Sequence, residues 1–243
     1  MRSRLRHLAR LFRGPDTSSV ISYGESRGEI LRQLINSIWY IYGADVCGDV
    51  IEFGTMSGFT AKHIAAAMSH LEKSFPISRR LVLADSFEGL PVSTAEADQA
   101  SPHVAKGIWT AGSCKVLSRV QLEELCRREF DPSRIDILEG WFSNTVPTLS
   151  ADRRFAMLHV DCDLYQSTVD ALTPLFANGM VSEGAIFLFD DWNCNRASPS
   201  YGERRAWAEL TSRFEIVSSP CCDYSWHGHK LIVHGYKGMP QGS

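Results

Sequence analysis

Residues 50–72, VIEFGTMSGFTAKHIAAAMSHLE, hold a short, mostly apolar segment, a turn with two glycines and a run of helix-forming residues. A short apolar run before a glycine is typical of a buried strand, and residues 61–72 have the composition of a helix. A strand, a turn and a helix in this order form the first part of a βαβ unit. The stretch therefore favours an α/β fold.

The same alternation continues along the chain. Further strands are expected at residues 81–84, 135–138, 155–160, 185–189, 214–217 and 231–234. Further helices are expected at residues 29–42, 121–128, 167–176 and 203–213. Strands that alternate with helices predict a doubly wound, mostly parallel sheet, here ending in a terminal pair of strands.

The domain organisation follows from where this alternation begins. We expect a basic N-terminal arm at residues 1–24 and a single domain at residues 25–243. Residues 91–118 are polar, contain Pro and Gly, and are longer than an ordinary connection. Long loops in compact domains often cover a binding site, so this segment is predicted to be a lid insertion.

The composition excludes several classes of protein. The 243 residues include 25 Lys and Arg against 28 Asp and Glu, with 44% hydrophobic residues and a formal net charge of -3. A globular domain is expected, without the basic surplus that favours nucleic-acid binding. We expect no membrane span and no secretory signal, and therefore a cytoplasmic protein.

The seven cysteines show no CxxC spacing, which favours a reducing compartment over a disulfide framework. A zinc site at Cys221, Cys222, His227 and His229 is a weak alternative, because adjacent cysteines suit tetrahedral coordination poorly.

Acidic residues follow several of the expected strands. Asp85, Asp161, Asp190 and Asp191 come directly after strand segments, at the edge where ligands bind in such sheets. Asp85 is placed to accept hydrogen bonds from ribose hydroxyls. In the first turn, Gly54 and Gly58 let a ligand approach the backbone. Their GxxxG spacing differs from the GxGxxG of dinucleotide sites, which favours a ligand without a diphosphate.

Three of these carboxylates, those of Asp161, Asp190 and Asp191, are expected to converge. Carboxylates that share a site repel one another unless a cation neutralises them, and Mg²⁺ prefers oxygen ligands of this kind. A solvated loop rim is the alternative for the three residues. For Asp163, which precedes a helix, a capping role is an equal alternative.

Taken in order, these segments resemble the macrocin O-methyltransferase family, the sugar O-methyltransferases of antibiotic biosynthesis within the class I S-adenosyl-L-methionine-dependent methyltransferases. The resembling segments are GDVIEFGTMSGFTA from Gly48, ADSFEGLP from Ala84, WTAGSC from Trp109, EGWFSNTVP from Glu139, HVDCDLYQST from His159, FDDW from Phe189 and YGERRAW from Tyr201. The resemblance implies a Rossmann-like fold with a seven-stranded sheet. The basic arm and residues 221–234 have no counterpart in the family that we recognise.

The resemblance also implies roles for particular residues. Cofactor-binding roles at the methionine, ribose and adenine parts of S-adenosyl-L-methionine fall on Glu52, Gly54, Ser57, Gly58, Asp85, Ser86, Glu139 and Gly140. Asp161, Asp190 and Asp191 would bind Mg²⁺. Asp161 would also be the general base, with His159 as an assisting catalytic residue or, alternatively, a structural one.

The function implied is Mg²⁺-dependent transfer of a methyl group from S-adenosyl-L-methionine to a hydroxyl of a glycosylated or polyhydroxylated natural product, by a homo-oligomer that acts on small molecules. One alternative changes the acceptor to a catechol-like phenol or a nitrogen. Another is a cofactor-binding protein without catalysis. A third, metal-dependent phosphoryl transfer, is weakened because the sequence has no P-loop.

Overall fold

The computed structural model describes residues 27–240, so the expected basic arm at residues 1–24 lies outside the described residues. Within them, seven strands form one sheet in the order β3-β2-β1-β4-β5-β7-β6. The strands are β1 (Asp49–Phe53), β2 (Leu81–Asp85), β3 (Ile135–Glu139), β4 (Phe155–Val160), β5 (Val181–Phe189), β6 (Val217–Tyr224) and β7 (Gly228–Gly235). Strands β1 to β5 pair in parallel, whereas β7 is antiparallel to both β5 and β6. The predicted doubly wound, mostly parallel sheet is confirmed.

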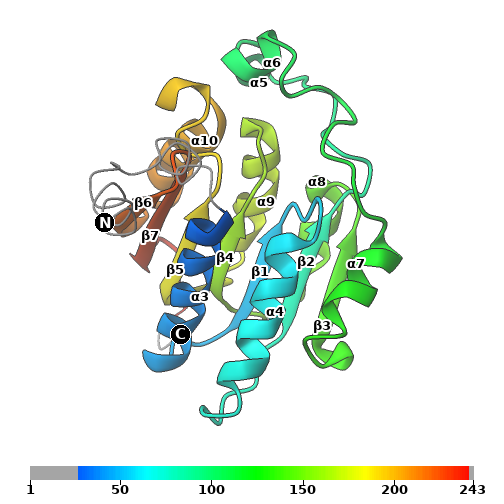
Figure 1. Cartoon of the computed structure of the whole chain (residues 1–243). Helices are drawn as coiled ribbons and strands as arrows, with labels where there is room; N and C mark the ends of the chain where they lie inside the picture. Colours follow the sequence, from blue (N-terminus) through cyan, green and yellow to red (C-terminus); the bar gives the residue numbers. More distant parts are fainter. Residues whose placement is uncertain (1–26, 241–243) are drawn as a thin grey trace, which may run out of the picture.

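Helices cover both faces of this sheet (Figure 1). One face packs against α3 (Arg27–Gly43), α4 (Phe59–Leu71) and α7 (Arg119–Cys126). The other face packs against α8 (Phe142–Thr145), α9 (Tyr165–Ala177) and α10 (Gly202–Phe214). Because helices cover both faces, every residue of the central strand β4 is buried, which explains why all of its residues except His159 are apolar.

Shorter elements complete the described chain. The short helices α5 (Glu96–Gln99) and α6 (Pro102–Ala105) lie beyond the carboxyl ends of the strands (Figure 1). Three 3₁₀ turns are η1 (Pro132–Arg134), η2 (Val146–Thr148) and η3 (Asn195–Ala197). No helix within residues 27–240 is both long enough and apolar enough to cross a bilayer.

The strand expected at residues 214–217 is wrong in position. Helix α10 continues to Phe214 and ends at Glu215, whose φ of 52° lies in the left-handed region. Strand β6 starts only at Val217 and runs through Pro220 to Tyr224. Proline is tolerated there because β6 is the edge strand of the sheet. The Cys- and His-rich residues 221–234 therefore form most of a hairpin made of β6 and β7.

The parallel strands bring their carboxyl ends to one edge of the sheet. Backbone hydrogen bonds continue just past the strand ends, from Gly54 N–H to Ala84 C=O (2.9 Å) and from Asp161 N–H to Phe53 C=O (3.0 Å). Asp190 N–H donates in the same way to Val160 C=O (2.9 Å). The residues that follow β1, β4 and β5 are thereby fixed side by side.

Candidate active site

A cavity of about 550 Å³ opens at this edge of the sheet. Its walls come from the strand ends, from residues 89–94 and Asp98, and from the start of α9. Among the residues expected to bind the cofactor, those that line the cavity are Gly54, Asp85, Ser86 and Gly140. Those that lie outside its lining are Glu52, Ser57, Gly58 and Glu139.

Gly54 allows the ends of β1 and β4 to approach each other. Its φ is 83°, and a Cβ atom at this position would lie 2.0 Å from the carbonyl oxygen of Asp161. No side chain fits at that distance. A glycine is therefore required here because the backbone after β4 lies so close, whether or not a ligand also approaches this turn.

The carboxylate of Asp85 organises the turn that follows β1. Its Oδ2 accepts hydrogen bonds from Thr55 N–H (2.7 Å), Thr55 Oγ1–H (2.7 Å) and Met56 N–H (3.3 Å). Its Oδ1 accepts one from Phe87 N–H (2.7 Å). A carboxylate oxygen commonly accepts two hydrogen bonds, so Oδ1, which accepts one here, retains capacity for a further donor.

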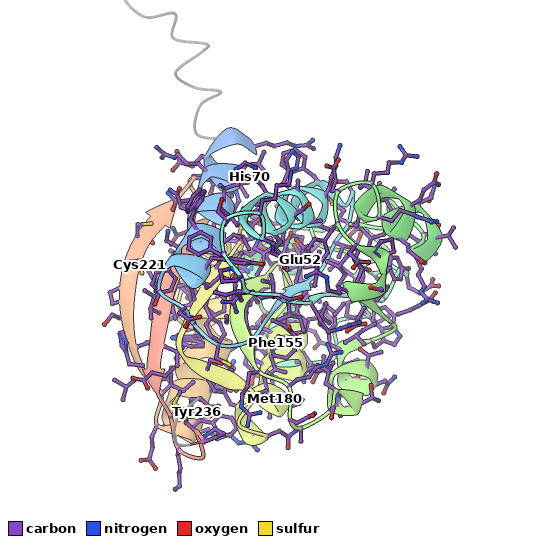
Figure 2. All side chains as sticks on the ribbon, turned by 90° about the horizontal axis from the view of Figure 1, so that it is seen from below. Glu52, His70, Phe155, Met180, Cys221 and Tyr236 are labelled. Atoms are coloured by element: carbon purple, nitrogen blue, oxygen red, sulfur yellow. The ribbon has the colours of Figure 1, made fainter. Side chains whose placement is uncertain are left out.

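Glu52 and His159 form a buried pair behind the cavity wall. They face each other on the neighbouring strands β1 and β4, with Nδ1 of His159 2.9 Å from Oε1 of Glu52. Figure 2 shows Glu52 in the interior of the molecule. Burial lowers the pKa of His159, but the hydrogen bond and charge of Glu52, together with the charges of Asp190 and Asp191, outweigh it, so the pKa is raised. Neither side chain lines the cavity, so the pair contributes to the site from behind the strand ends.

Four aspartates gather just after β4 and β5, and three of them, Asp161, Asp163 and Asp190, line the cavity. Asp161, Asp163 and Asp191 offer carboxylate oxygens that lie within 4.8 Å of one another, and within residues 27–240 they form the group that could hold a metal ion. Asp190 lines the same cavity, with its Oδ2 3.8 Å from Nδ1 of His227. The possible zinc ligands in residues 221–229 do not form such a group, and the seven cysteines are unpaired.

The electrostatics of this cluster favour a cation. Burial, followed by the charges of Asp190 and Asp191, raises the pKa of Asp161 and of Asp163 well above the ordinary value. Burial and the charge of Asp190 raise the pKa of Asp191 to about 6. One buried oxygen of Asp190 and one of Asp191 have no hydrogen-bond partner. A hard divalent cation relieves this repulsion and satisfies such oxygens.

Asp98 performs the capping role that was one alternative for Asp163. Its carboxylate accepts hydrogen bonds from Tyr165 N–H (2.7 Å) and Gln166 N–H (3.1 Å) at the start of α9. No local sequence pattern indicates this contact, because Asp98 lies 67 residues before Tyr165. Asp163 is instead free to face the cavity, where its backbone has a φ of 58°.

Residues 91–118 contact the rest of the domain at several points, and two of these contacts involve the buried polar side chains of Asp98 and Asn195. One is the contact of Asp98 with α9. The other is a reciprocal pair of hydrogen bonds, in which His103 N–H donates to Asn195 Oδ1 (2.9 Å) and Asn195 N–H donates to His103 Nδ1 (3.1 Å). The beginning of this segment therefore forms a wall of the cavity.

Apolar side chains surround the opening above the acidic floor. Met56, Val92 and Trp141 line the cavity and are all solvent-exposed, Val92 at 72%. Exposed apolar groups beside convergent polar ones are typical of small-molecule sites. The cavity thus suits a ligand that presents hydroxyl groups to the aspartates and an apolar body to the rim.

Solved structures with the same fold include two methyltransferases. The O-methyltransferase NovP aligns with a TM-score of 0.67 at 24% identity, covering 85% of this chain and 80% of NovP. The calicheamicin methyltransferase CalS11 aligns with a TM-score of 0.65 at 24% identity, covering 95% of this chain and 90% of that one. The fold is therefore that of the class I methyltransferases.

Curated relatives are O-methyltransferases. The demethyldecarbamoylnovobiocin O-methyltransferase of Streptomyces niveus is 30% identical over 190 residues, 75% of this chain and 66% of the relative. The mycinamicin III 3''-O-methyltransferase of Micromonospora griseorubida is 29% identical over 170 residues, 65% of this chain and 62% of the relative. The chain thus spans a little under two thirds of these relatives. The family described as macrocin-O-methyltransferase (TylF) matches residues 13–221, and the chain belongs to this family.

Proposed function

We propose that this protein transfers a methyl group from S-adenosyl-L-methionine to a hydroxyl of a glycosylated natural product, with Mg²⁺ as a second cofactor. The observation that carries the proposal is the convergence of the Asp161, Asp163 and Asp191 carboxylates within 4.8 Å of one another, beside a cavity that Asp161, Asp163 and Asp190 line. Membership of a family of antibiotic O-methyltransferases supports the reaction class.

The cofactor is proposed to occupy the side of the cavity formed by β1, β2 and β3. Gly54 and Ser86 lie on this wall, and Gly140 follows β3. The remaining acceptor position on Oδ1 of Asp85 suits a ribose hydroxyl. Glu52 and Gly58 act on the cofactor through the shape of the turn, because neither lines the cavity. For Ser57 and Glu139, binding of the cofactor stays a prediction.

The aspartates supply the ligands for the cation. Asp161, Asp190 and Asp191 would hold Mg²⁺, and the oxygens of Asp190 and Asp191 that have no hydrogen-bond partner fit that role. The group of three carboxylates within 4.8 Å contains Asp163 in place of Asp190, so Asp163 is proposed as a further ligand. When bound, the cation would stabilise negative charge on the acceptor oxygen.

The acceptor hydroxyl also needs a base. Asp161 is the base implied by the family resemblance, and Asp163, which lines the same cavity, is a second candidate. His159 is proposed to orient the end of β4 through its contact with Glu52, because it is fully buried.

The acceptor is proposed to enter between the apolar rim and residues 91–118, which would close as a lid. Enclosure aligns the acceptor oxygen with the methyl group and keeps water out, which accounts for much of the rate of such reactions. A catechol-like acceptor remains the second candidate, since the exposed ring of Trp141 at the rim also suits an aromatic substrate. The homo-oligomeric state and the cytoplasmic location stay predictions.

The decisive experiment combines metal removal with a matched pair of variants. Methyl transfer to a panel of glycosylated and phenolic acceptors is measured after EDTA treatment and after Mg²⁺ is restored. We expect EDTA to stop turnover, and Asp161→Ala to abolish it while S-adenosylhomocysteine binding changes by less than about threefold. Asp152→Ala is the control, because Asp152 is an exposed residue that contacts Ser150, before the start of β4. Full activity in EDTA would reject the cation, and an active Asp161→Ala variant would reject the assigned site.

A further inference from the structure

We propose that Glu203, Arg204 and His227, here called the clamp residues, are positioning residues for the aspartate pair. They hold the loop of residues 190–193, here called the aspartate loop, so that Asp190 and Asp191 keep their carboxylates at the cation site. The proposal rests on the proposed function, because this geometry matters only if the pair binds a cation.

The aspartate loop needs an external restraint. It leaves the end of β5 and carries two adjacent carboxylates toward those of Asp161 and Asp163, which repel them. Its backbone N–H and C=O groups also need partners, since buried main-chain groups are rarely left unpaired. Asp190 N–H donates to Val160 C=O, and Asp191 C=O accepts from Cys194 N–H. Further partners come from two elements that lie at the same side of the molecule as the end of β5, namely α10 and the β6–β7 hairpin (Figure 1).

Glu203 ties down the main chain of Asp191. It is 1% exposed, and its Oε2 accepts a hydrogen bond from Asp191 N–H at 3.0 Å. Its Oε1 is buried without a partner, so Asp191 N–H is the contact that its carboxyl group makes in the described chain. A carboxyl group buried beside other acids is unfavourable for folding, which points to a role in the site rather than in the core.

Arg204 holds the second half of the loop. Its Nε donates a hydrogen bond to Trp192 C=O (2.8 Å), and its Nη2 donates one to Asn193 Oδ1 (2.6 Å). The guanidinium also lies 5.0 Å from the centroid of the Trp192 ring. The planar fork of an arginine is suited to hold two acceptors at once in this way.

His227 connects the loop to the turn between β6 and β7. Its Nδ1–H donates to Asp190 C=O, and its own C=O accepts a hydrogen bond from Asn193 N–H (2.8 Å). Nδ1 also lies 3.8 Å from Oδ2 of Asp190, so His227 restrains the main chain of that residue by a hydrogen bond and lies beside its carboxylate.

Together the clamp residues contact every residue of the aspartate loop. This gives a role to two parts of the sequence that the proposed reaction leaves unused. One is the start of α10 in the segment YGERRAW, and the other is the turn of residues 225–227, which contains His227.

The test is Mg²⁺ binding by isothermal titration calorimetry to the full chain with S-adenosylhomocysteine present. Loss of a group that orients a metal ligand typically weakens metal binding about 10- to 100-fold, and we expect this for Glu203→Ala, Arg204→Gln and His227→Phe. Glu203→Gln keeps an acceptor for Asp191 N–H, so it should restore the affinity to within about threefold of the unchanged protein.

Two controls match the variants in chemistry. Arg205→Gln removes the neighbouring arginine, which pairs with Glu209, and His234→Phe removes a histidine that contacts Ser219. Both should bind Mg²⁺ normally. Thermal unfolding in EDTA and S-adenosylhomocysteine binding should be unchanged in Arg204→Gln and His227→Phe, which separates positioning from a general loss of structure.

The outcomes separate the two proposals. If the unchanged protein binds Mg²⁺ and the clamp variants bind it equally well, the clamp is refuted and the proposed function stands. If Glu203→Gln binds Mg²⁺ as weakly as Glu203→Ala, loss of the hydrogen bond to Asp191 N–H does not cause the lower affinity, and the role assigned to Glu203 is refuted. If the unchanged protein binds no Mg²⁺, the cation of the proposed function fails, and the clamp fails with it.

Discussion

Replacing Gly54 with alanine tests the contact between the turn after β1 and the cation site. The added Cβ atom would lie 2.0 Å from the carbonyl oxygen of Asp161, whereas real Cβ atoms essentially never approach closer than 3.0 Å. The two strand ends must therefore separate by about 1 Å or more, which is the difference between these two distances. The hydrogen bond between Asp161 N–H and Phe53 C=O lies within the part that moves.

The expected loss of stability has two parts. Alanine at a φ of 83° adds left-handed strain of about 1–2 kcal/mol. Overpacking against the backbone of Asp161 adds about 1–3 kcal/mol. Gly54→Ala should therefore lower the free energy of unfolding by about 2–5 kcal/mol, and a domain of ordinary stability would still fold. Since Asp161 moves by about 1 Å, turnover should fall about 100-fold.

Two further glycines separate the strain from the contact. Gly107 has a φ of 69° with open space around it, so Gly107→Ala should lose only the strain of about 1–2 kcal/mol. Gly43 has neither a positive φ nor a neighbour within 4 Å, so Gly43→Ala should change the stability by less than about 1 kcal/mol. The measurement is urea unfolding of all three variants. A free energy of unfolding for Gly54→Ala equal to that of Gly107→Ala would refute the close contact with Asp161.

Three other predictions concern Asp85 at the turn after β1, Asp98 in residues 91–118 and Asp136 in β3. Asp85→Asn should destabilise the domain by about 1–3 kcal/mol, because the NH₂ group of the asparagine would replace one carboxylate oxygen and face an N–H group that then has no acceptor. An unchanged urea midpoint would contradict this. Asp98→Ala removes the cap of α9 and should lower the free energy of unfolding by about 1–2 kcal/mol. It should also speed amide hydrogen exchange in residues 91–118, and exchange rates equal to those of the unchanged protein would show that Asp98 does not anchor this segment. The hydrogen bond from Arg80, and then Arg153, holds the pKa of Asp136 below its usual value. This stabilisation is present above the ordinary aspartate pKa of about 3.9 and is lost as the pH falls further, so Asp136→Asn should destabilise at pH ~7 but hardly at pH ~2. Equal destabilisation at both pH values would contradict the ion pair.

The central part of the fold follows directly from the sequence. Strands β1, β2, β4 and β5 are buried on both faces, so each appears as an apolar run, and their carboxyl ends lie at one edge for topological reasons. The place of Asp85, Asp161 and Asp190 at that edge is predictable for the same reason. The exposed edge strand β6 has no such pattern, which is why residues 214–217 were assigned to it incorrectly.

The supporting residues of the site are not predictable in this way. The hydrogen-bonded residues are far apart in the sequence: 12 residues separate Glu203 from Asp191, 37 separate His227 from Asp190, and 67 separate Asp98 from Tyr165. Each contact depends on how α10, the hairpin and residues 91–118 fold back onto the strand ends. Local sequence patterns describe single elements, so they contain no information about these long-range partners.

The central claim is transfer of a methyl group to a sugar hydroxyl. The most direct measurement incubates the protein with Mg²⁺, a glycosylated acceptor and S-adenosyl-L-methionine that carries a deuterated methyl group, and analyses the product by tandem mass spectrometry. We expect the label on a hydroxyl oxygen of the sugar and no labelled product when EDTA is present. Label on a nitrogen or on a phenol, or no labelled product with any glycosylated acceptor while the cofactor binds, would contradict it.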